Sequence, residues 1–273
     1  MYTSACRARI SCAGFVILLQ IVMTAPAGAQ PGDVDFSYNA PGKLAPGAGQ
    51  GRQDRKIYLP GIVFPVELVA EPGAFPNSQV HGIGGQFGPP GSLCADKNYL
   101  MPWTDTYCEK RDWDMPLCPT GKGHQGNDIR GPRAPRPPGQ ADKNCIDDHW
   151  NVVAVEDGVI TRVSSYPIVY MKGDSGTLYR YMHVNPNSIQ VQANQRVTAG
   201  TPLAKISNFM EGQANQTSFH VHFDARQNVP VQGTVQSVYV PPYTSLIAAY
   251  RKGKGLPPMD SGGSLQVDPQ REK

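Results

Sequence analysis

Three short stretches of the sequence contain residue types that bind metals and move protons. They are His124-Gln125-Gly126-Asn127-Asp128, Tyr181-Met182-His183 and His220-Val221-His222-Phe223. A catalytic zinc ion usually takes three nitrogen or oxygen ligands from the protein and leaves a fourth position for water. Two histidines and one aspartate from these stretches would meet that requirement. The sequence therefore indicates a catalytic metal site.

The spacing within these stretches indicates which side chains can point together. Residues two apart on a strand face the same side, so His220 and His222 should lie next to each other. One of them could then bind a metal while the other handles protons. The H-x-x-x-D stretch would supply a nitrogen and an oxygen from an irregular turn, in which Gly126 permits a backbone course that a larger residue would hinder. Each pattern also occurs by chance, so their combination carries the prediction.

The elements that must position these residues are short strands. From Asn151 onward, brief β-type runs alternate with Gly, Asn or Asp, which predicts an antiparallel, mainly β core. The expected strands are residues 152–155, 158–163, 168–171, 177–183, 189–191, 203–206 and 219–225. Residues 57–69 add strand material at a sheet edge because of their prolines. One helix is predicted at 243–252, with Thr244 as its cap and Gly253 as its stop.

The order of the motifs resembles the catalytic domain of the lysostaphin-type, or LytM-like, peptidases. His124 to Ile129 is similar to that family's opening H-x-G-x-D-[IL] motif, and Tyr179 to Val184 to its central Y-x-H-[LV] motif. The closing H-[LV]-H-F-[ED] motif matches His220 to Asp224. Two further segments, 153–160 and 191–204, resemble the family's strand pair and glycine-containing segment. The resemblance covers 124 to about 226.

The resemblance implies a zinc metallopeptidase that cleaves the peptide part of bacterial peptidoglycan, either in a stem peptide or in a cross-link. It makes His124, Asp128 and His222 the zinc ligands and His183 and His220 the unliganded catalytic pair. Tyr181 is a further candidate for a hydrogen bond to substrate, with an ordinary core tyrosine as the alternative interpretation. The implied fold is a small, mainly β domain in which an antiparallel sheet forms an open, sandwich-like groove, similar to half of a lipoyl-type barrel.

The chain departs from the family pattern in several places. The segment 131–150 is longer than the usual link, Asn194 stands where Gly is usual, and Asp224 replaces the commoner Glu. None of these changes removes a ligand, and the long segment could wall the groove. The histidines His81 and His149 are interpreted as surface residues. For three aromatic residues a packing role is favoured over a platform for glycan: Trp103, Tyr107 and Trp113.

The first residues have the layout of a cleaved secretory signal. Arg7 and Arg9 precede an apolar run and the small residues at 27–29, so cleavage is expected after Ala29 and export to the periplasm or the exterior follows. No later stretch is long enough for a membrane span. The formal charge of +3, two units of which come from those arginines, gives no basic footprint for nucleic acid.

The mature chain would keep four cysteines, and an even number in an exported chain predicts two disulfides. They are Cys94, Cys108, Cys118 and Cys145, and the sequence leaves open which pairs form. The absence of close C-x-x-C spacing disfavours a structural zinc site. The cysteines should tie down a loop-rich N-terminal region.

The expected organisation is one catalytic domain with appendages. Its parts are a signal peptide (1–29), a flexible leader (30–55), a disulfide-tied extension (56–123), a zinc peptidase domain (124–240), a short helix (241–253) and a disordered tail (254–273). Peptidoglycan peptides are the expected partners, together with other cell-wall enzymes, and the sequence does not indicate an oligomeric state. One alternative is a catalytically silent LytM-like protein that binds or activates cell-wall hydrolases. Another is a lipoyl- or biotinyl-type carrier, although Lys172 lies outside the expected hairpin.

Overall fold

The computed structural model describes residues 1, 36–70, 75–81, 96–99, 101–132 and 149–257. The described chain is mainly β, with a single α-helix. Its strands, 3-10 helices and α-helix are β1 (Asn77–Ser78), η1 (Asp96–Tyr99), β2 (Asn127–Arg130), β3 (Asn151–Val153), β4 (Gly158–Ser164), β5 (Ile168–Gly173), β6 (Leu178–Met182), η2 (Pro186–Ser188), β7 (Arg196–Val197), β8 (Pro202–Lys205), β9 (Val221–Val231), β10 (Thr234–Tyr239) and α1 (Tyr243–Gly253).

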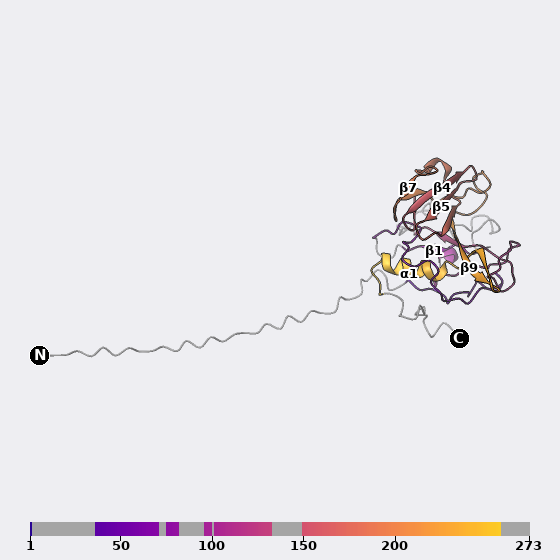
Figure 1. Cartoon of the computed structure of the whole chain (residues 1–273), viewed down its shortest axis with the longest axis horizontal. Coiled ribbons are helices and arrows are strands. Elements are labelled where there is room, and N and C mark those ends of the chain that lie inside the picture. The colour runs from indigo at the N-terminus through magenta and orange to yellow at the C-terminus, as the bar shows by residue number, and fades with distance from the viewer. Residues whose placement is uncertain (2–35, 71–74, 82–95, 100, 133–148, 258–273) are drawn as a thin grey trace.

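Eight of the strands form one antiparallel sheet in the order β1-β2-β9-β6-β5-β4-β7, with β10 also paired to β9. The end strands β1 and β7 do not pair with each other, so the sheet is open. Strands β3 and β8 form a separate two-stranded antiparallel sheet. Figure 1 shows β4, β5 and β7 gathered at one end of the molecule and β9 with α1 at the other. The predicted mainly β, antiparallel, open fold is confirmed.

Strand β9 is the element that joins the parts of the sheet. Its first half pairs with β2 on one side and β6 on the other, while its second half forms a hairpin with β10. Val221, Phe223 and Ala225 point into the core and are fully buried. The residues between them, His222 and Asp224, are also buried, on the opposite face. A strand that is covered on both faces can bury polar side chains only where they have partners.

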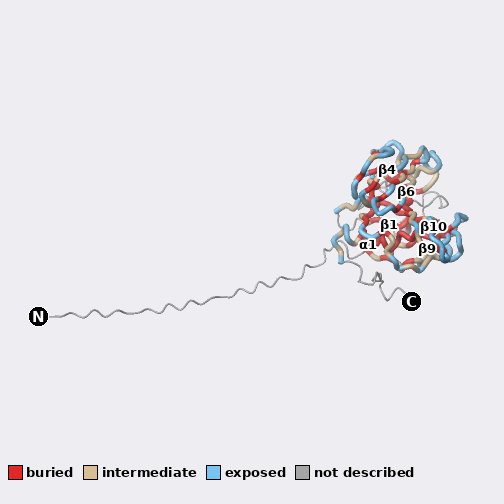
Figure 2. The backbone as a smooth tube through the Cα atoms, in the orientation of Figure 1, coloured by how far each residue is buried: buried red, intermediate tan, exposed pale blue. Residues whose placement is uncertain are grey.

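The core lies between the sheet and the segments that precede and follow it, where Figure 2 shows the buried residues concentrated. Phe36 stacks on Tyr250 of α1 with ring centroids 4.0 Å apart, and Trp103 stacks on Tyr243 at 5.4 Å. The sequence predicted a flexible leader over 30–55. From Phe36 onward this prediction was wrong, because aromatic side chains of the leader pack against the helix.

Several other expectations changed at the level of single elements. Residues 189–191 are not a strand, whereas β1, β2, β7 and β10 are strands that the sequence did not predict. Pro242, rather than Thr244, occupies the N-cap position of α1, and the Thr244 hydroxyl donates to the backbone oxygen of Asp54. Lys254 is not part of a disordered tail, since its Nζ donates to the carbonyl of Val69 at 2.8 Å.

Residues 57–69 run beside β3, as an edge segment should. Val63 donates its backbone N–H to Val155, and Glu67 donates to Asn151. Regular β-pairing of this segment with β3 is limited to one bridge, between Val66 and Val152, because prolines interrupt the run. The segment thus extends the smaller sheet without forming a regular strand.

One of the expected disulfides lies in the described chain, between Cys108 and Cys118. Cys94 and Cys145 lie outside the described residues, as do the predicted signal peptide after Met1, most of the 131–150 insertion and the tail from 258. No helix in the described part of the chain combines the length and apolar character needed to cross a membrane.

Candidate metal centre

The backbone pairing of β2 with β9 brings the first and last motifs together. Asp128 lies directly opposite His222 in the antiparallel register, and opposed residues project to the same face. The turn before β2 can approach β9 this closely only because residue 126 is glycine. A Cβ on Gly126 would lie 2.1 Å from the carbonyl oxygen of Phe223. The glycine is therefore needed for close backbone approach.

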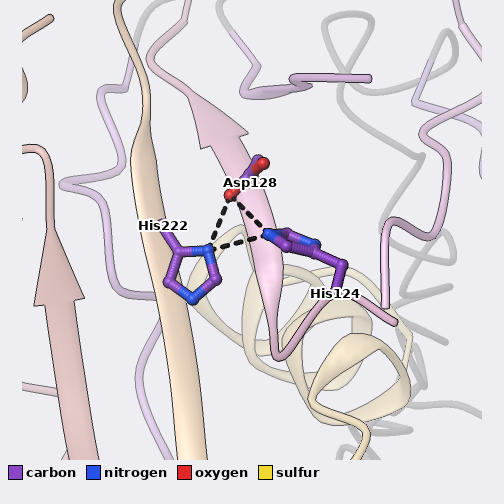
Figure 3. A group of neighbouring side chains, drawn as sticks. All are labelled: His124, Asp128 and His222. Carbon is purple, nitrogen blue, oxygen red and sulfur yellow. Dashed lines mark hydrogen bonds and ion pairs between the residues drawn. The ribbon is translucent and has the colours of Figure 1, made fainter. Parts of the chain in front are cut away.

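His124, Asp128 and His222 converge on one point, as Figure 3 shows. His222 Nδ1 lies 2.9 Å from Asp128 Oδ1 and 2.9 Å from His124 Nε2, and His124 Nε2 lies 3.3 Å from Asp128 Oδ1. All three residues are buried. Residues that are 94 and 98 positions apart in the sequence thus meet at a single site.

The other two motif histidines lie beside this group. The rings of His183 and His220 are 4.7 Å apart, and His183 lies 6.5 Å from the ring of His222. His220 Nε2 is 3.7 Å from Asp128 Oδ1. His220 and His222 share one face of the chain, as their spacing predicted. The structure therefore gathers all five predicted site residues in one place.

Each of these histidines has one ring nitrogen held by an acceptor. Nδ1 of His124, His183 and His220 lies 2.8 Å from the backbone carbonyl oxygens of Thr106, Phe209 and Ser218 respectively. Nε2 of His222 lies 2.8 Å from Asp224 Oδ2. Carbonyl and carboxylate oxygens only accept hydrogen bonds, so each of these nitrogens must carry the ring proton. The opposite nitrogen of His124, His183 and His220 is left with a lone pair when the ring is neutral, and Nδ1 of His222 has one when it carries no second proton toward Asp128.

This arrangement concentrates lone pairs and negative charge at the centre of the site. The lone pairs of His124 Nε2 and His222 Nδ1 face each other and an oxygen of Asp128. Three such atoms repel one another unless a cation lies among them. Burial on its own lowers the pKa of His222, but its hydrogen bonds to Asp128 and Asp224 outweigh this and raise the pKa to about 9. A proton on His222 can therefore relieve this repulsion, and a metal ion would replace that proton.

The donor set fits a tetrahedral metal such as zinc. Ligand atoms about 2.0–2.1 Å from a tetrahedral ion are about 3.3 Å from one another. The three contacts of 2.9, 2.9 and 3.3 Å are close to that spacing. Two imidazoles and one carboxylate leave a fourth position for a water molecule or a substrate oxygen, which is the pattern of a catalytic site.

Sequence reasoning missed the residues that hold the ligands in place. Asp224 is fully buried and receives hydrogen bonds from the guanidinium of Arg180, which lies opposite it on β6. Thr106 accepts from His124 through its carbonyl, and its hydroxyl oxygen accepts the backbone N–H of Asp128 at 2.9 Å. Asp224 could have been found by strand periodicity, since it is two residues beyond His222. No sequence pattern pointed to Thr106.

The environment keeps the remaining two histidines neutral. Burial lowers the pKa of His183 to about 3, and the neighbouring rings of His220 and His222 act in the same direction. Burial likewise lowers the pKa of His220 to about 4, although Asp128 opposes the shift. Both imidazoles are uncharged at neutral pH and can accept a proton.

The site opens into a cleft of about 700 Å³. Its lining includes Gln79, His81 and part of the loop closed by the disulfide, with Lys110, Arg111 and Trp113. Apolar side chains line it as well: Pro167, Ile168, Met182, Phe209 and Met210. The same lining contains the five motif residues His124, Asp128, His183, His220 and His222. The metal position is therefore open to a substrate that enters this cleft.

Comparison with known protein families gives one match. Residues 144–234 match the model of peptidase family M23. In this segment the chain resembles the M23 peptidases. The matched segment contains His183, His220 and His222, whereas His124 and Asp128 precede it. The lysostaphin-type resemblance inferred from the motifs is thus confirmed, and the M23-like segment needs β2 to complete the group of five.

Solved structures show partial similarity to this chain. A Ruminococcus gnavus ATCC 29149 protein named for the glycyl-glycine endopeptidase lytM is 22% identical, with a TM-score of 0.34, over 48% of this chain and 48% of that one. The catalytic domain of lysostaphin from Staphylococcus simulans is 21% identical, with a TM-score of 0.31, over 52% and 92%. A zinc-containing peptidase from Vibrio cholerae is 20% identical, with a TM-score of 0.27, over 47% and 32%. No significant match to a curated protein sequence was found.

Three weaker predictions are decided by the structure. The hydroxyl of Tyr181 points into the core and accepts the backbone N–H of Val155 at 3.1 Å, which supports the core interpretation over contact with substrate. Trp103 and Tyr107 are buried, as the packing role requires, but Trp113 is 49% exposed at the cleft wall, so for Trp113 that role was wrong. Exposed His149 lies away from the cleft lining, whereas exposed His81 forms part of it.

Proposed function

We propose that the chain is an exported zinc metallopeptidase that hydrolyses peptide bonds in peptidoglycan stem peptides or cross-links. The observation that supports this most strongly is the group of three lone-pair atoms on His124, Asp128 and His222, which face one another and call for a cation. Family resemblance adds the substrate class. In this proposal residues 124–240 are the catalytic domain, and the signal at 1–29 directs the protein to the periplasm or the exterior.

The three ligands and the two other histidines have separate roles in the proposal. When bound, zinc lowers the pKa of water and polarises the scissile carbonyl. His183 or His220 accepts a proton as the water oxygen forms a bond to the carbonyl carbon. The same imidazole, once protonated, gives its proton to the leaving nitrogen as the carbon–nitrogen bond breaks. Positioned proton transfer of this kind contributes about 10² to 10⁴ in rate.

The hydrogen bonds at Nδ1 of His183 and His220 are consistent with a role in proton transfer. Because Phe209 and Ser218 accept the Nδ1 protons of His183 and His220, both rings keep Nε2 as the acceptor. Protonation at Nε2 creates an imidazolium whose Nδ1–H still has its carbonyl partner. The rings can therefore gain and lose a proton without reorienting, which supports their role as general bases and acids.

A carrier role receives no support from the fold. Lys172 lies within β5, where it pairs with Val159 and Leu178. A lysine that carries a swinging cofactor must stand at an exposed turn, and Lys172 is held in the middle of a sheet. The remaining rival is the catalytically silent M23-like binding protein, and the complete set of ligands favours the enzyme.

Digestion of purified cell-wall fragments, with mass analysis of the released peptides, tests the proposal. The zinc-loaded wild type should release peptides, and His222→Ala or Asp128→Ala should lose bound zinc and cleavage together. His149→Ala is the matched control, because His149 is an exposed histidine outside the cleft lining, and it should retain both. Cleavage by a zinc-free preparation would contradict the proposal. A zinc-loaded wild type that binds cell wall but releases nothing would favour the silent binding protein.

A further inference from the structure

Arg180, which is partly exposed, and the fully buried Asp224 form an ion pair directly behind the metal centre. They lie opposite each other on β6 and β9. The guanidinium Nε donates to Asp224 Oδ1 at 3.0 Å and to Oδ2 at 2.9 Å, and its terminal nitrogen donates to Oδ2 at 2.6 Å. Asp224 is fully buried. The guanidinium of Arg180 also lies 4.8 Å from the ring centroid of Tyr239. The arginine therefore fixes the plane of the carboxylate.

The same carboxylate contacts a proposed ligand. Asp224 Oδ2 lies 2.8 Å from His222 Nε2, on the side of the ring away from Asp128. An ionised carboxylate has no hydrogen to donate, so the proton of this bond must belong to Nε2. Asp128 Oδ1 lies 2.9 Å from the other nitrogen, Nδ1, so a neutral His222 can place its one proton on either side, and only the proton on Nε2 leaves a lone pair on Nδ1. That lone pair faces Asp128 and His124.

A second contact connects the ion pair with the turn that carries His124. The guanidinium of Arg180 donates to Gln125 Oε1 at 2.8 Å. Gln125 is next to His124 in the H-x-x-x-D stretch. One continuous set of hydrogen bonds thus runs from Gln125 through Arg180 and Asp224 to His222. It connects the segments that supply two of the three ligands.

We propose that Arg180 and Asp224 are positioning residues that hold His222 in the tautomer and orientation required to bind zinc. This inference rests on the proposed zinc site and adds to it the source of its affinity. A buried ion pair is weak evidence for stability, because desolvation offsets the attraction between the charges. Partners that orient a metal-binding histidine, in contrast, typically change metal affinity about 10–100-fold when they are mutated.

The substitution Asp224→Asn has a specific expected effect. Asp224 Oδ2 meets both the Arg180 terminal nitrogen and His222 Nε2, so the amide oxygen should take the Oδ2 position and the NH2 group the Oδ1 position. A neutral amide oxygen holds the Nε2 proton less strongly than a carboxylate does. The share of His222 with its proton on Nδ1 should rise, and that proton blocks the lone pair needed for zinc. Zinc affinity, measured by competition with a chelator on the folded protein, should therefore fall about 10–100-fold.

Two control variants distinguish this effect from general disturbance. Asp174→Asn makes the same chemical change in another Arg–Asp pair, with Arg196, which is exposed and contacts no histidine. Glu156→Gln alters a carboxylate that accepts hydrogen bonds from the hydroxyls of Tyr179 and Ser175, each at 2.6 Å. Asp174→Asn should leave both stability and zinc affinity unchanged. Glu156→Gln should lower the melting temperature but leave zinc affinity at the wild-type value.

The ring tautomer gives a readout that a purely structural role would not change. Nitrogen NMR of histidine-labelled, metal-free protein at a pH where His222 is neutral should show the proton of His222 on Nε2 in the wild type and a larger share of Nδ1 protonation in Asp224→Asn. Asp224→Glu, which keeps the carboxylate, should restore the Nε2 proton and part of the zinc affinity. If Asp224→Asn does not fold, Arg180→Lys takes its place, with a several-fold loss of zinc affinity expected from the lost second contact.

The outcomes separate this inference from the proposed function. If the wild type binds no zinc, the proposed function itself fails. If the wild type binds zinc and Asp224→Asn, or Arg180→Lys in its place, binds it with unchanged affinity, the positioning role is wrong although the zinc site stands. An unchanged His222 tautomer in Asp224→Asn would overturn the inference in the same way.

Discussion

At the scale of single residues, function depends on which nitrogen of each histidine is free. The sequence predicted the five residues that meet, from their types and their order along the chain. It could not predict their tautomers, because these are set by Thr106, Phe209, Ser218 and Asp224, whose contacts arise only in the folded chain. Residue identity therefore indicated the chemistry, and the fold determined where each proton lies.

The same scale explains why Tyr181 takes the core position, the second of its two interpretations. Residues two apart share a face only while the strand continues, and β6 ends at Met182. His183 has a φ of 61°, in the left-handed region, so its side chain turns away from the alternation of the strand. Tyr181 points into the core while His183 faces the cleft. A periodicity argument cannot detect a single backbone residue of this kind.

Replacing His183 or His220 with Ala should separate zinc binding from catalysis. Neither imidazole belongs to the three-ligand group, so bound zinc should remain near wild-type levels. Cleavage of cell-wall peptides should fall about 10² to 10⁴-fold, because proton transfer is lost. Tyr181→Phe is the control and should keep its rate, since its hydroxyl faces Val155. Loss of zinc in His183→Ala would show that His183 is a ligand, contrary to this assignment.

At the scale of elements, strand pairing does most of the positioning. Patterns of short apolar runs predicted β3 to β6, β8 and the start of β9. They missed β2, whose sequence looks like part of an irregular turn. They also missed β10, because its first residues are mostly polar and do not form an apolar run. The pairing of β2 with β9 could not be deduced from the residues of either strand alone. That pairing is what places Asp128 opposite His222.

The loop closed by Cys108–Cys118 is a second positioning element. Cys108 donates its backbone N–H to the carbonyl of His124, and Glu109 accepts the N–H of His124 through its own carbonyl. The loop is therefore paired with the residue that begins the metal motif. Four of its residues, Lys110, Arg111, Asp112 and Trp113, line the cleft.

The double substitution of Cys108 and Cys118 with Ser should lower the free energy of unfolding by about 3 kcal/mol. A closed loop of this length removes about that much from the unfolded state in the chain-entropy account. Chemical denaturation of the variant and the wild type, each in oxidising and in reducing buffer, measures the change. The variant should still bind zinc, because all three ligands remain. Equal stability of the two proteins in oxidising buffer would contradict this role for the disulfide.

At the scale of the whole molecule, residues 36–55 contribute side chains to the core. Their composition, rich in Gly, Pro, Ala and Gln, predicted flexibility, but two aromatic residues, Phe36 and Tyr38, are buried. Composition averages over a segment and so overlooks single anchors. Farther along, Arg52 donates to the carbonyl of Leu117, and Thr244 of α1 donates to the backbone oxygen of Asp54. These bonds tie the segment to the loop closed by the disulfide and to α1.

The stability that this attachment contributes should depend on pH through Asp54. Burial alone raises the pKa of Asp54, but hydrogen bonds from Tyr58, the Lys56 N–H and Arg52 outweigh it and lower the pKa. A carboxyl group whose pKa is lowered by folding stabilises the protein above its unfolded pKa, and loses that contribution as the pH falls through its folded pKa.

The substitution Asp54→Asn should therefore lower the free energy of unfolding by about 1 kcal/mol at pH 7, a value reduced by the partial exposure of the group. The difference from wild type should shrink as the pH falls below about 4, the pKa of an unperturbed aspartate. Thermal or chemical unfolding of both proteins from pH 3 to pH 7 measures it. Asp112→Asn, at an exposed carboxylate, is the control. A difference that grew toward low pH would contradict the assignment.

The most direct test of the metal centre is diffraction from crystals of the zinc-loaded protein at wavelengths on both sides of the zinc absorption edge. We predict one anomalous peak within coordination distance of His124 Nε2, Asp128 Oδ1 and His222 Nδ1, with His183 and His220 nearby but not coordinated. A zinc peak elsewhere, with no peak among these three atoms, would contradict the assignment.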